Sequence, residues 1–116
     1  MRVKEKIIHA EEVHTGRKKL NNIVLTIKDD KIASITSKGF DHKKAVHLII
    51  PTFIDLQVYG SLGKLFSSYP DIKTLEIMEK HHQKNGTFFF QPTIASNSYE
   101  VIYKCIEAVK KHKEKN

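Results

Sequence analysis

A largely apolar stretch, Leu48 to Gly60, constrains the fold of this chain more than any other segment. Residues 45–58 have an extended pattern that is interrupted at Pro51. Proline removes a backbone donor from a strand ladder, so it is rarely found inside a paired strand. The break therefore predicts two strands, the first belonging with the preceding residues and the second with the residues that follow.

The end of the second strand is the one place in the chain that is typical of the start of a site. Asp55, Gln57 and Tyr59 alternate along it and are expected to project from the same side, beside the loop 60–63. In a parallel barrel, active sites are built at the carboxyl ends of the strands. The position of these three side chains therefore favours a site there.

The residues before Pro51 predict a β-rich unit. A short strand is expected over residues 2–10, and Ile23, Leu25 and Ile27 alternate along residues 22–28. Asp29-Asp30 is a turn signal, and residues 31–35 follow as a second strand. Two apolar runs around such a turn are typical of a hairpin.

The residues after Pro51 change to a helical pattern. Asp71 is expected to cap a helix, because its carboxylate can accept from free amides of the first turn. Asn85-Gly86 is expected to end this helix, since glycine tolerates the left-handed backbone of many helix stops. The predicted buried stripe consists of Ile72, Leu75, Ile77 and Met78.

A second strand and a second helix follow. Residues 87–93 are apolar on both faces, which favours a parallel strand covered on both sides. Asn97 is expected to cap the next helix, with Glu100 as the returning half of a capping box. The predicted buried stripe of that helix consists of Val101, Ile102, Cys105, Ile106 and Val109.

The order strand, helix, strand, helix predicts a parallel pair of strands, and the chain belongs to the α/β class. Two parallel strands neither close a barrel nor fill an open sheet. The edges of strands 53–58 and 87–91 are therefore expected to be exposed and to promote association. The chain therefore resembles the first part of a larger α/β domain.

Composition excludes several classes of protein. The 116 residues are enough for one domain, and no apolar run approaches the roughly 20 residues of a membrane span. The net charge of +7 is spread over residues 17–19, 43–44 and 110–115 rather than along one stripe, so a nucleic-acid-binding protein is the last-ranked hypothesis. The lone Cys105 excludes an internal disulfide, and no signal-peptide core is present, so we expect a cytoplasmic protein without membrane contact.

Four stretches have the order and spacing of a known enzyme family. They are residues 53–60, 63–67, 74–78 and 86–98, and the segment from Pro51 to Gln57 is similar to the PGFID opening of amidohydrolase barrels. Together they resemble the first third of the N-acetylglucosamine-6-phosphate deacetylases. Thr52 stands where that opening usually has glycine.

The resemblance implies a fold. Residues 1–50 would be part of a flanking β-sandwich, of which the hairpin is a portion. Residues 51–116 would be the first two β/α units of a (β/α)₈ TIM barrel belonging to a metal-dependent hydrolase.

The resemblance also implies a reaction, the hydrolysis of the acetamide of an amino-sugar phosphate to acetate and a free amine. A divalent metal of zinc or iron type would activate the water in the complete enzyme. The family's metal ligands and catalytic base are expected beyond Asn116, so we predict no catalytic residue, no metal ligand and no bound metal in this segment alone. The alternative is a non-catalytic, truncated homologue that acts as an association module, either with itself or with the missing carboxyl-terminal part.

Site residues carried over by the resemblance lie at the predicted strand end. Many amidohydrolases have a His-x-His pair there, which the deacetylases replace with glutamine and asparagine. Gln57 matches that pattern, whereas Tyr59 departs from it. Gln57, Tyr59 and Gly60 would form the rim of a substrate or metal pocket, and Asp55 would anchor neighbouring backbone amides.

Gln57 has two open interpretations. It borders the pocket and positions a water or a sugar hydroxyl, or it only makes hydrogen bonds within the barrel mouth. The second is favoured, because buried polar groups are normally satisfied in that way.

Two further features are interpreted as structural. His81 and His82 are adjacent on a helix and diverge by about 100°, so they cannot easily bind one ion. His82 is expected near the buried stripe and His81 near solvent. Cys105 is expected to be a buried and inert thiol.

Overall fold

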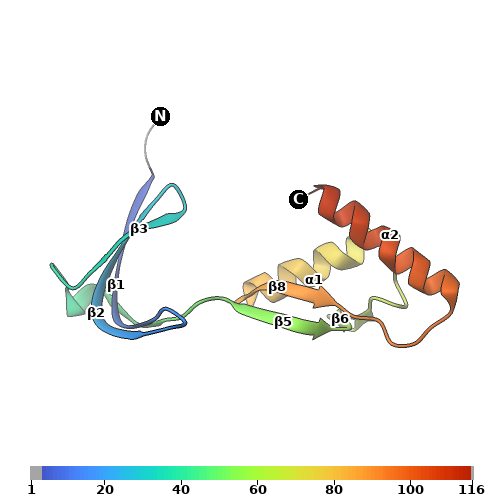
Figure 1. The fold of residues 1–116 in the computed structure, drawn as a ribbon, viewed down its shortest axis with the longest axis horizontal. Helices are drawn as coiled ribbons and strands as arrows, with labels where there is room; N and C mark the ends of the chain where they lie inside the picture. Colours follow the sequence, from blue (N-terminus) through green and yellow to red (C-terminus); the bar gives the residue numbers. More distant parts are fainter. Residues whose placement is uncertain (1–3, 116) are drawn as a thin grey trace. The chain divides into compact units, whose positions relative to one another are not determined.

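The chain divides into two units at Pro51, as seen in a computed structural model that describes residues 4–115 (Figure 1). The first unit extends to Pro51 and the second begins at Thr52. The predicted break at Pro51 is confirmed, since one strand ends at Ile49 and the next begins at Phe53. Residues 2 and 3 of the first predicted strand lie outside the described residues.

The first unit is a four-stranded sheet with the order β3-β2-β1-β4. Its strands are β1 (Glu5–His14), β2 (Lys19–Lys28), β3 (Lys31–Thr36) and β4 (Ala45–Ile49). The predicted hairpin is confirmed, because β2 and β3 pair antiparallel around Asp29 and Asp30, which both have positive φ. β4 pairs in parallel with β1, so this strand belongs with the hairpin unit as predicted.

The core of this sheet is small. Ala10, Val13, Ile23 and Leu25 form one buried cluster. Ile27 was expected on the same face and is half-buried. The register shift beside it leaves Ala33 of β3 unpaired, and the regular pairing of β2 with β1 continues through Lys28.

The second unit contains a parallel strand pair, as predicted. β5 (Phe53–Val58) pairs with β8 (Thr87–Pro92), and α1 (Ile72–Lys84) connects them. α2 (Tyr99–Lys115) follows, and α1 packs against both β8 and α2. The sequence did not predict the short antiparallel ribbon of β6 (Gly60–Ser61) and β7 (Lys64–Leu65).

The core of the second unit lies between the strands and the helices. It consists of Val58, Phe66, Leu75, Met78, Cys105 and Ala108. Cys105 is 2% exposed, which confirms the prediction of a buried thiol. Burial also raises the pKa of this thiol above its ordinary value, so it stays protonated and unreactive.

The ends of α1 are as predicted. The Asp71 carboxylate accepts a hydrogen bond from the Thr74 backbone N–H at 2.7 Å, and this bond holds the pKa of Asp71 below its usual value. At the other end Gly86 has a φ of +87°, in the region that favours glycine.

The predicted cap of α2 is wrong by one residue. The Ser98 hydroxyl accepts from Val101 N–H at 3.4 Å, and the Ser98 carbonyl accepts from Ile102 N–H. Asn97 instead accepts from Ser98 N–H. With the cap at Ser98, Glu100 is too close for a capping box, and its carboxylate pairs with Lys104 at 2.7 Å.

Two burial predictions in this unit are also wrong. Phe88 and Phe89 of β8 are 57% and 62% exposed, so the strand is not covered on both sides by the described residues. On α2, Ile106 is exposed while Ala108 is buried. The two-stranded sheet and two helices leave apolar side chains that nothing in residues 4–115 covers.

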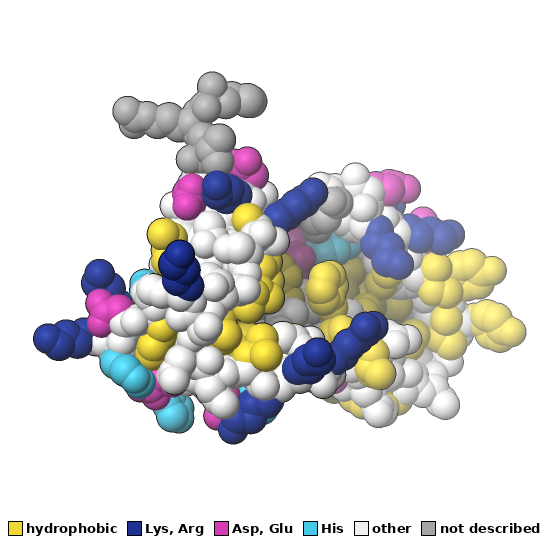
Figure 2. All heavy atoms as spheres, turned by 60° about the vertical axis from the view of Figure 1, so that its left-hand side comes forward, with side chains coloured by type: hydrophobic (Ala, Val, Ile, Leu, Met, Phe, Trp, Pro, Cys, Tyr) yellow, Lys and Arg dark blue, Asp and Glu magenta, His cyan; other side chains and the backbone are white. Residues whose placement is uncertain are grey.

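No helix within residues 4–115 is long and apolar enough to cross a membrane. On the face drawn in Figure 2, lysine and arginine side chains are scattered rather than gathered in one stripe, with hydrophobic side chains between them.

Candidate functional site

Asp55, Gln57 and Tyr59 form a short chain of contacts at the end of β5. The Gln57 side-chain amide donates to the Tyr59 hydroxyl at 2.8 Å, so these two side chains lie together. The Asp55 carboxylate accepts from the Gln57 backbone N–H at 3.1 Å. Gln57 and Tyr59 are both exposed, and Asp55 is half-buried.

A shallow cavity of about 510 Å³ runs along this strand end. The predicted residues Asp55, Gln57, Tyr59 and Gly60 all line it. The remaining lining residues are Val58, Ser61, Gly63, Lys64, Leu65 and His82. The cavity therefore combines one carboxylate, one ammonium group and several neutral hydrogen-bonding groups.

Gly60 is required by the ribbon that forms one wall of this cavity. A Cβ atom at residue 60 would lie 2.0 Å from the Lys64 carbonyl oxygen, a separation that no real structure tolerates. Across the same ribbon, Phe66 N–H donates to the Tyr59 carbonyl at 2.8 Å. Gly60 thus shapes the wall by letting two backbones approach closely.

His82 and Ser61 are cavity residues that sequence reasoning missed. The His82 ring stacks on Phe90, with centroids 5.3 Å apart and planes inclined at 26°. His82 Nε2 and Ser61 Oγ are buried and have no hydrogen-bond partner among the described residues. His81 is half-buried as well. No local pattern marks Ser61, because only tertiary packing buries it.

The residues present do not fit a metal centre. Among residues 4–115, no group of three or more histidine, cysteine, aspartate or glutamate side chains is placed to hold an ion. At the cavity Asp55 is the single carboxylate and His82 the single imidazole, and the amide oxygen of Gln57 and the phenol of Tyr59 are weak ligands.

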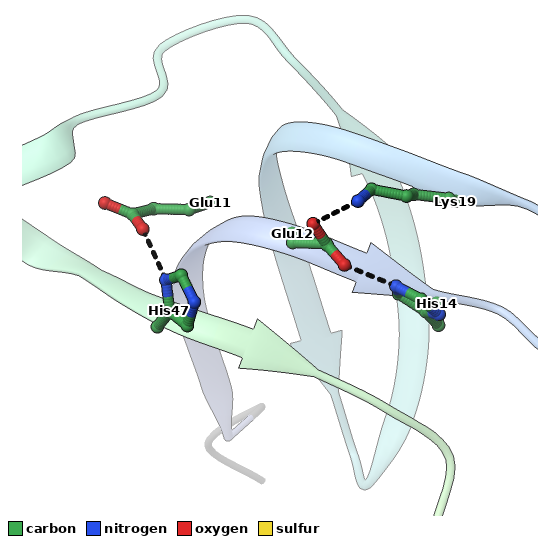
Figure 3. Close-up of polar contacts among 5 residues, drawn as sticks. All are labelled: Glu11, Glu12, His14, Lys19 and His47. Atoms are coloured by element: carbon green, nitrogen blue, oxygen red, sulfur yellow. Dashed lines mark hydrogen bonds and ion pairs between the residues drawn. The ribbon is translucent and has the colours of Figure 1, made fainter.

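A second group of titratable side chains lies in the other unit, on β1 and its neighbours (Figure 3). Glu11 contacts His47 of β4 at 2.8 Å, and this hydrogen bond is the main cause of the lowered pKa of Glu11. Glu12 contacts Lys19 and His14, and its pKa is lowered chiefly by Lys19. These pairs are exposed and add little stability. The pairs of Glu11 with His47 and of Glu12 with Lys19 join neighbouring strands, whereas Glu12 and His14 both belong to β1.

This chain is similar in sequence to several known proteins. No protein-family model matches the chain. An N-acetylgalactosamine-6-phosphate deacetylase from Shewanella sp. (strain ANA-3) is 28% identical over 89 residues, which are 77% of this chain and 23% of the relative. An N-acetylglucosamine-6-phosphate deacetylase from Haemophilus influenzae is 33% identical over 64 residues, which are 55% of this chain and 17% of the relative.

Two solved structures share the fold. The N-acetylglucosamine-6-phosphate deacetylase of Pasteurella multocida matches 96% of this chain with a TM-score of 0.76 and 24% identity, over 31% of its own length. The Mycobacterium smegmatis enzyme, a D267A mutant in complex with N-acetyl-D-glucosamine-6-phosphate, matches 97% of this chain with a TM-score of 0.74 and 19% identity, over 30% of its own length.

The chain therefore spans only 17% to 31% of the length of the relatives it matches. The resemblance predicted from the four sequence stretches is confirmed by matches in both sequence and structure. In sequence and in fold, this chain is similar to part of the N-acetylglucosamine-6-phosphate deacetylases.

Proposed function

We propose that this chain is the amino-terminal part of a metal-dependent N-acetylglucosamine-6-phosphate deacetylase. One observation carries the proposal: the sequence similarity to two sugar-phosphate deacetylases coincides with a structural match to the same class over 96% of the chain. The complete enzyme would hydrolyse the acetamide of an amino-sugar phosphate, releasing acetate.

The proposed domain arrangement follows the two units. Residues 1–50 correspond to part of a flanking β-sandwich, and residues 51–116 to the first two β/α units of a (β/α)₈ barrel. The parallel pairing of β5 with β8 through α1 supports the second assignment, since such units build barrels.

In this proposal the chain contributes residues that border the active site, but no metal ligand and no catalytic residue. Gln57, Tyr59 and Gly60 border the pocket, and Asp55 holds the strand end through the Gln57 N–H. The contact between Gln57 and Tyr59 supports the interpretation in which Gln57 is satisfied locally. The divalent metal, of zinc or iron type, would be bound by side chains outside this segment, so the isolated chain is inactive.

A second candidate function is favoured by the exposed apolar side chains of β5 and β8. The chain would be a non-catalytic homologue that associates with itself or with a polypeptide supplying the rest of the fold. Exposed, apolar strand edges promote such contacts. The single cysteine supports the proposed cytoplasmic location of either form, because that compartment disfavours disulfides.

A chimera tests the first proposal. The segment of the Pasteurella multocida deacetylase that superposes on this chain is replaced by this chain, and acetate release from N-acetylglucosamine-6-phosphate is measured with added Zn²⁺ or Fe²⁺. We expect metal-dependent turnover, and we expect Tyr59→Asn to increase it, because asparagine is the residue that the resemblance implies at this position. A folded chimera that releases no acetate contradicts the proposal.

A further inference from the structure

The link between α1 and β8 is the dipeptide Asn85-Gly86, and no other asparagine in the sequence is followed by glycine. Asparagine is one of the thermolabile residues, because the backbone nitrogen of the next residue can attack its side-chain carbonyl carbon. Glycine has no Cβ atom to hinder that approach. Both residues are exposed, so water reaches this bond.

The reaction at such a bond needs water and no other reagent. The Gly86 nitrogen forms a bond to Asn85 Cγ, the bond from Cγ to Nδ2 breaks, and ammonia leaves with the proton of the Gly86 N–H. Water then opens the cyclic imide. Cleavage at the side-chain carbonyl gives aspartate, and cleavage at the main-chain carbonyl gives isoaspartate. No atom is oxidised or reduced.

The end of α1 restrains both reacting groups. Asn85 Nδ2 donates to the His81 carbonyl at 2.7 Å, and the Gly86 N–H donates to the Gln83 carbonyl at 3.1 Å. The attack needs the Gly86 nitrogen without its proton and the Asn85 side chain free to turn, so both bonds must break first. The reaction therefore requires local opening of the last turn of α1.

Gly86 is also held by the start of β5. Its carbonyl accepts from the Phe53 N–H at 2.9 Å and from the Thr52 hydroxyl at 2.7 Å. The Thr52 hydroxyl in turn accepts from the Phe88 N–H at 3.0 Å. The residue that would attack is thus fixed where α1, β5 and β8 meet, by groups that all lie between Thr52 and Phe88.

Neither product can keep these contacts. A carboxylate has no N–H to donate to the His81 carbonyl, and it places negative charge at the carboxyl end of α1, where the helix dipole is already negative. Isoaspartate also adds one carbon atom to the main chain directly before Gly86, whose carbonyl β5 holds. Conversion of Asn85 therefore removes part of the structure that slows it.

We propose that Asn85 is a site of spontaneous deamidation, that the closed end of α1 and the bonds from β5 to Gly86 slow this reaction, and that conversion loosens the junction of β5 with β8. The co-reactant is water, and no enzyme takes part. The inference does not depend on the proposed deacetylase activity, because it uses only groups within the second unit.

Peptide mapping by mass spectrometry tests the proposal on the 116-residue chain. The chain is kept at neutral pH, with and without urea, and samples are digested at mildly acidic pH, where the imide forms slowly. We expect aspartate and isoaspartate at residue 85, formed at least about tenfold more slowly in the folded chain than in urea. Asn97 is the internal reference, and it should convert more slowly than Asn85 in urea because the following Ser98 has a Cβ atom.

A pair of variants at residue 52 tests the restraint from β5. Thr52→Val removes the hydroxyl that donates to the Gly86 carbonyl, so it should speed conversion in the folded chain by about two- to tenfold, as for the loss of one hydrogen bond. The rate in urea should not change. Thr52→Ser keeps the hydroxyl and should convert at the rate of the wild type, and circular dichroism checks that both variants are folded.

A second pair tests the effect of conversion. Asn85→Asp reproduces the charge of the product and should lower the thermal unfolding midpoint of the freshly purified chain. Asn97→Asp is the matched control, because it adds the same charge before the amino end of α2, where the helix dipole is positive, and it should not lower the midpoint.

Three results would overturn the proposal. If residue 85 gained neither aspartate nor isoaspartate in urea, this bond would not be a deamidation site. If the folded chain converted as fast as the chain in urea, or if Thr52→Val left the folded rate unchanged, the restraint by α1 or by β5 would be refuted. If Asn85→Asp had the midpoint of the wild type, conversion would not loosen the junction.

Discussion

At the scale of single residues, Thr52 departs from the PGFID pattern, and its side chain has a structural role in this chain. Its hydroxyl donates to the Gly86 carbonyl at 2.7 Å and accepts from Phe88 N–H at 3.0 Å. It thereby ties the start of β5 to the start of β8. The glycine that the PGFID opening usually has at this position could make neither bond.

Thr52→Val should lower the free energy of unfolding by about 1 kcal/mol, because it keeps the side-chain shape and leaves both backbone groups without the hydroxyl. Urea denaturation followed by circular dichroism measures this. Thr52→Ser keeps the hydroxyl and is the control. Equal stability of the valine and serine variants would show that the bridge contributes nothing.

The contribution of Asp71 to the free energy of unfolding is expected to depend on pH. Asp71→Ala should cost about 1 kcal/mol at pH 7, because it removes the cap of α1. The pKa of Asp71 is lowered in the folded chain, so its contribution is fully present above the unfolded pKa of about 3.9. That contribution is lost as the pH falls through the lower, folded value.

The check is urea denaturation of both proteins at pH 7 and near pH 3. The difference between wild type and Asp71→Ala should shrink at the lower pH. Asp71→Asn keeps a capping oxygen and should remove only the part that depends on pH. If the difference in free energy of unfolding between wild type and Asp71→Ala grew on acidification, the proposed capping role of the Asp71 carboxylate would be contradicted.

At the scale of elements, local signals predicted most of the strands and helices. Pro51 separates β4 from β5, Asp29-Asp30 joins β2 to β3, and Asp71 and Gly86 limit α1. Each of these signals acts through its own backbone or its near neighbours. Such information is present in a short stretch of sequence, so it can be recognised without the fold.

The features that were missed depend on tertiary structure. The β6–β7 ribbon consists of two-residue strands, too short to show an alternating pattern. The exposure of Phe88 and Phe89 depends on how many strands the sheet has, which no local pattern gives. At the candidate site, the alternation of residues along β5 predicted that Gln57 and Tyr59 lie on the same side, and their side chains are in contact. His82 reaches the cavity only through the packing of α1, which no local pattern shows.

Gly60→Ala tests the ribbon as an element. The added Cβ would meet the Lys64 carbonyl at 2.0 Å, so β6 and β7 must separate. We expect a loss of about 1–3 kcal/mol in the free energy of unfolding, as for other overpacked sites. Gly63→Asn is the control, because residue 63 has open space and asparagine tolerates its positive φ. Equal losses for the two variants would mean that backbone strain, not the close approach, is what matters.

At the scale of the whole molecule, two small cores lie in two units, and many large apolar side chains remain exposed. The chain spans 31% of the Pasteurella multocida structure it matches, and the strand end it contributes has a single carboxylate and no metal cluster among residues 4–115. The molecule therefore carries the fold of one part of a deacetylase and the rim of its proposed pocket.

The most direct test of the proposed function is a measurement of acetate release from N-acetylglucosamine-6-phosphate. It is made side by side for the isolated 116-residue chain and for the Pasteurella multocida chimera. With Zn²⁺ or Fe²⁺ added, we expect turnover by the chimera and none by the isolated chain. Metal-dependent turnover by the isolated chain would contradict the proposal that its chemistry comes from other residues, and a folded but inactive chimera would contradict the proposed function itself.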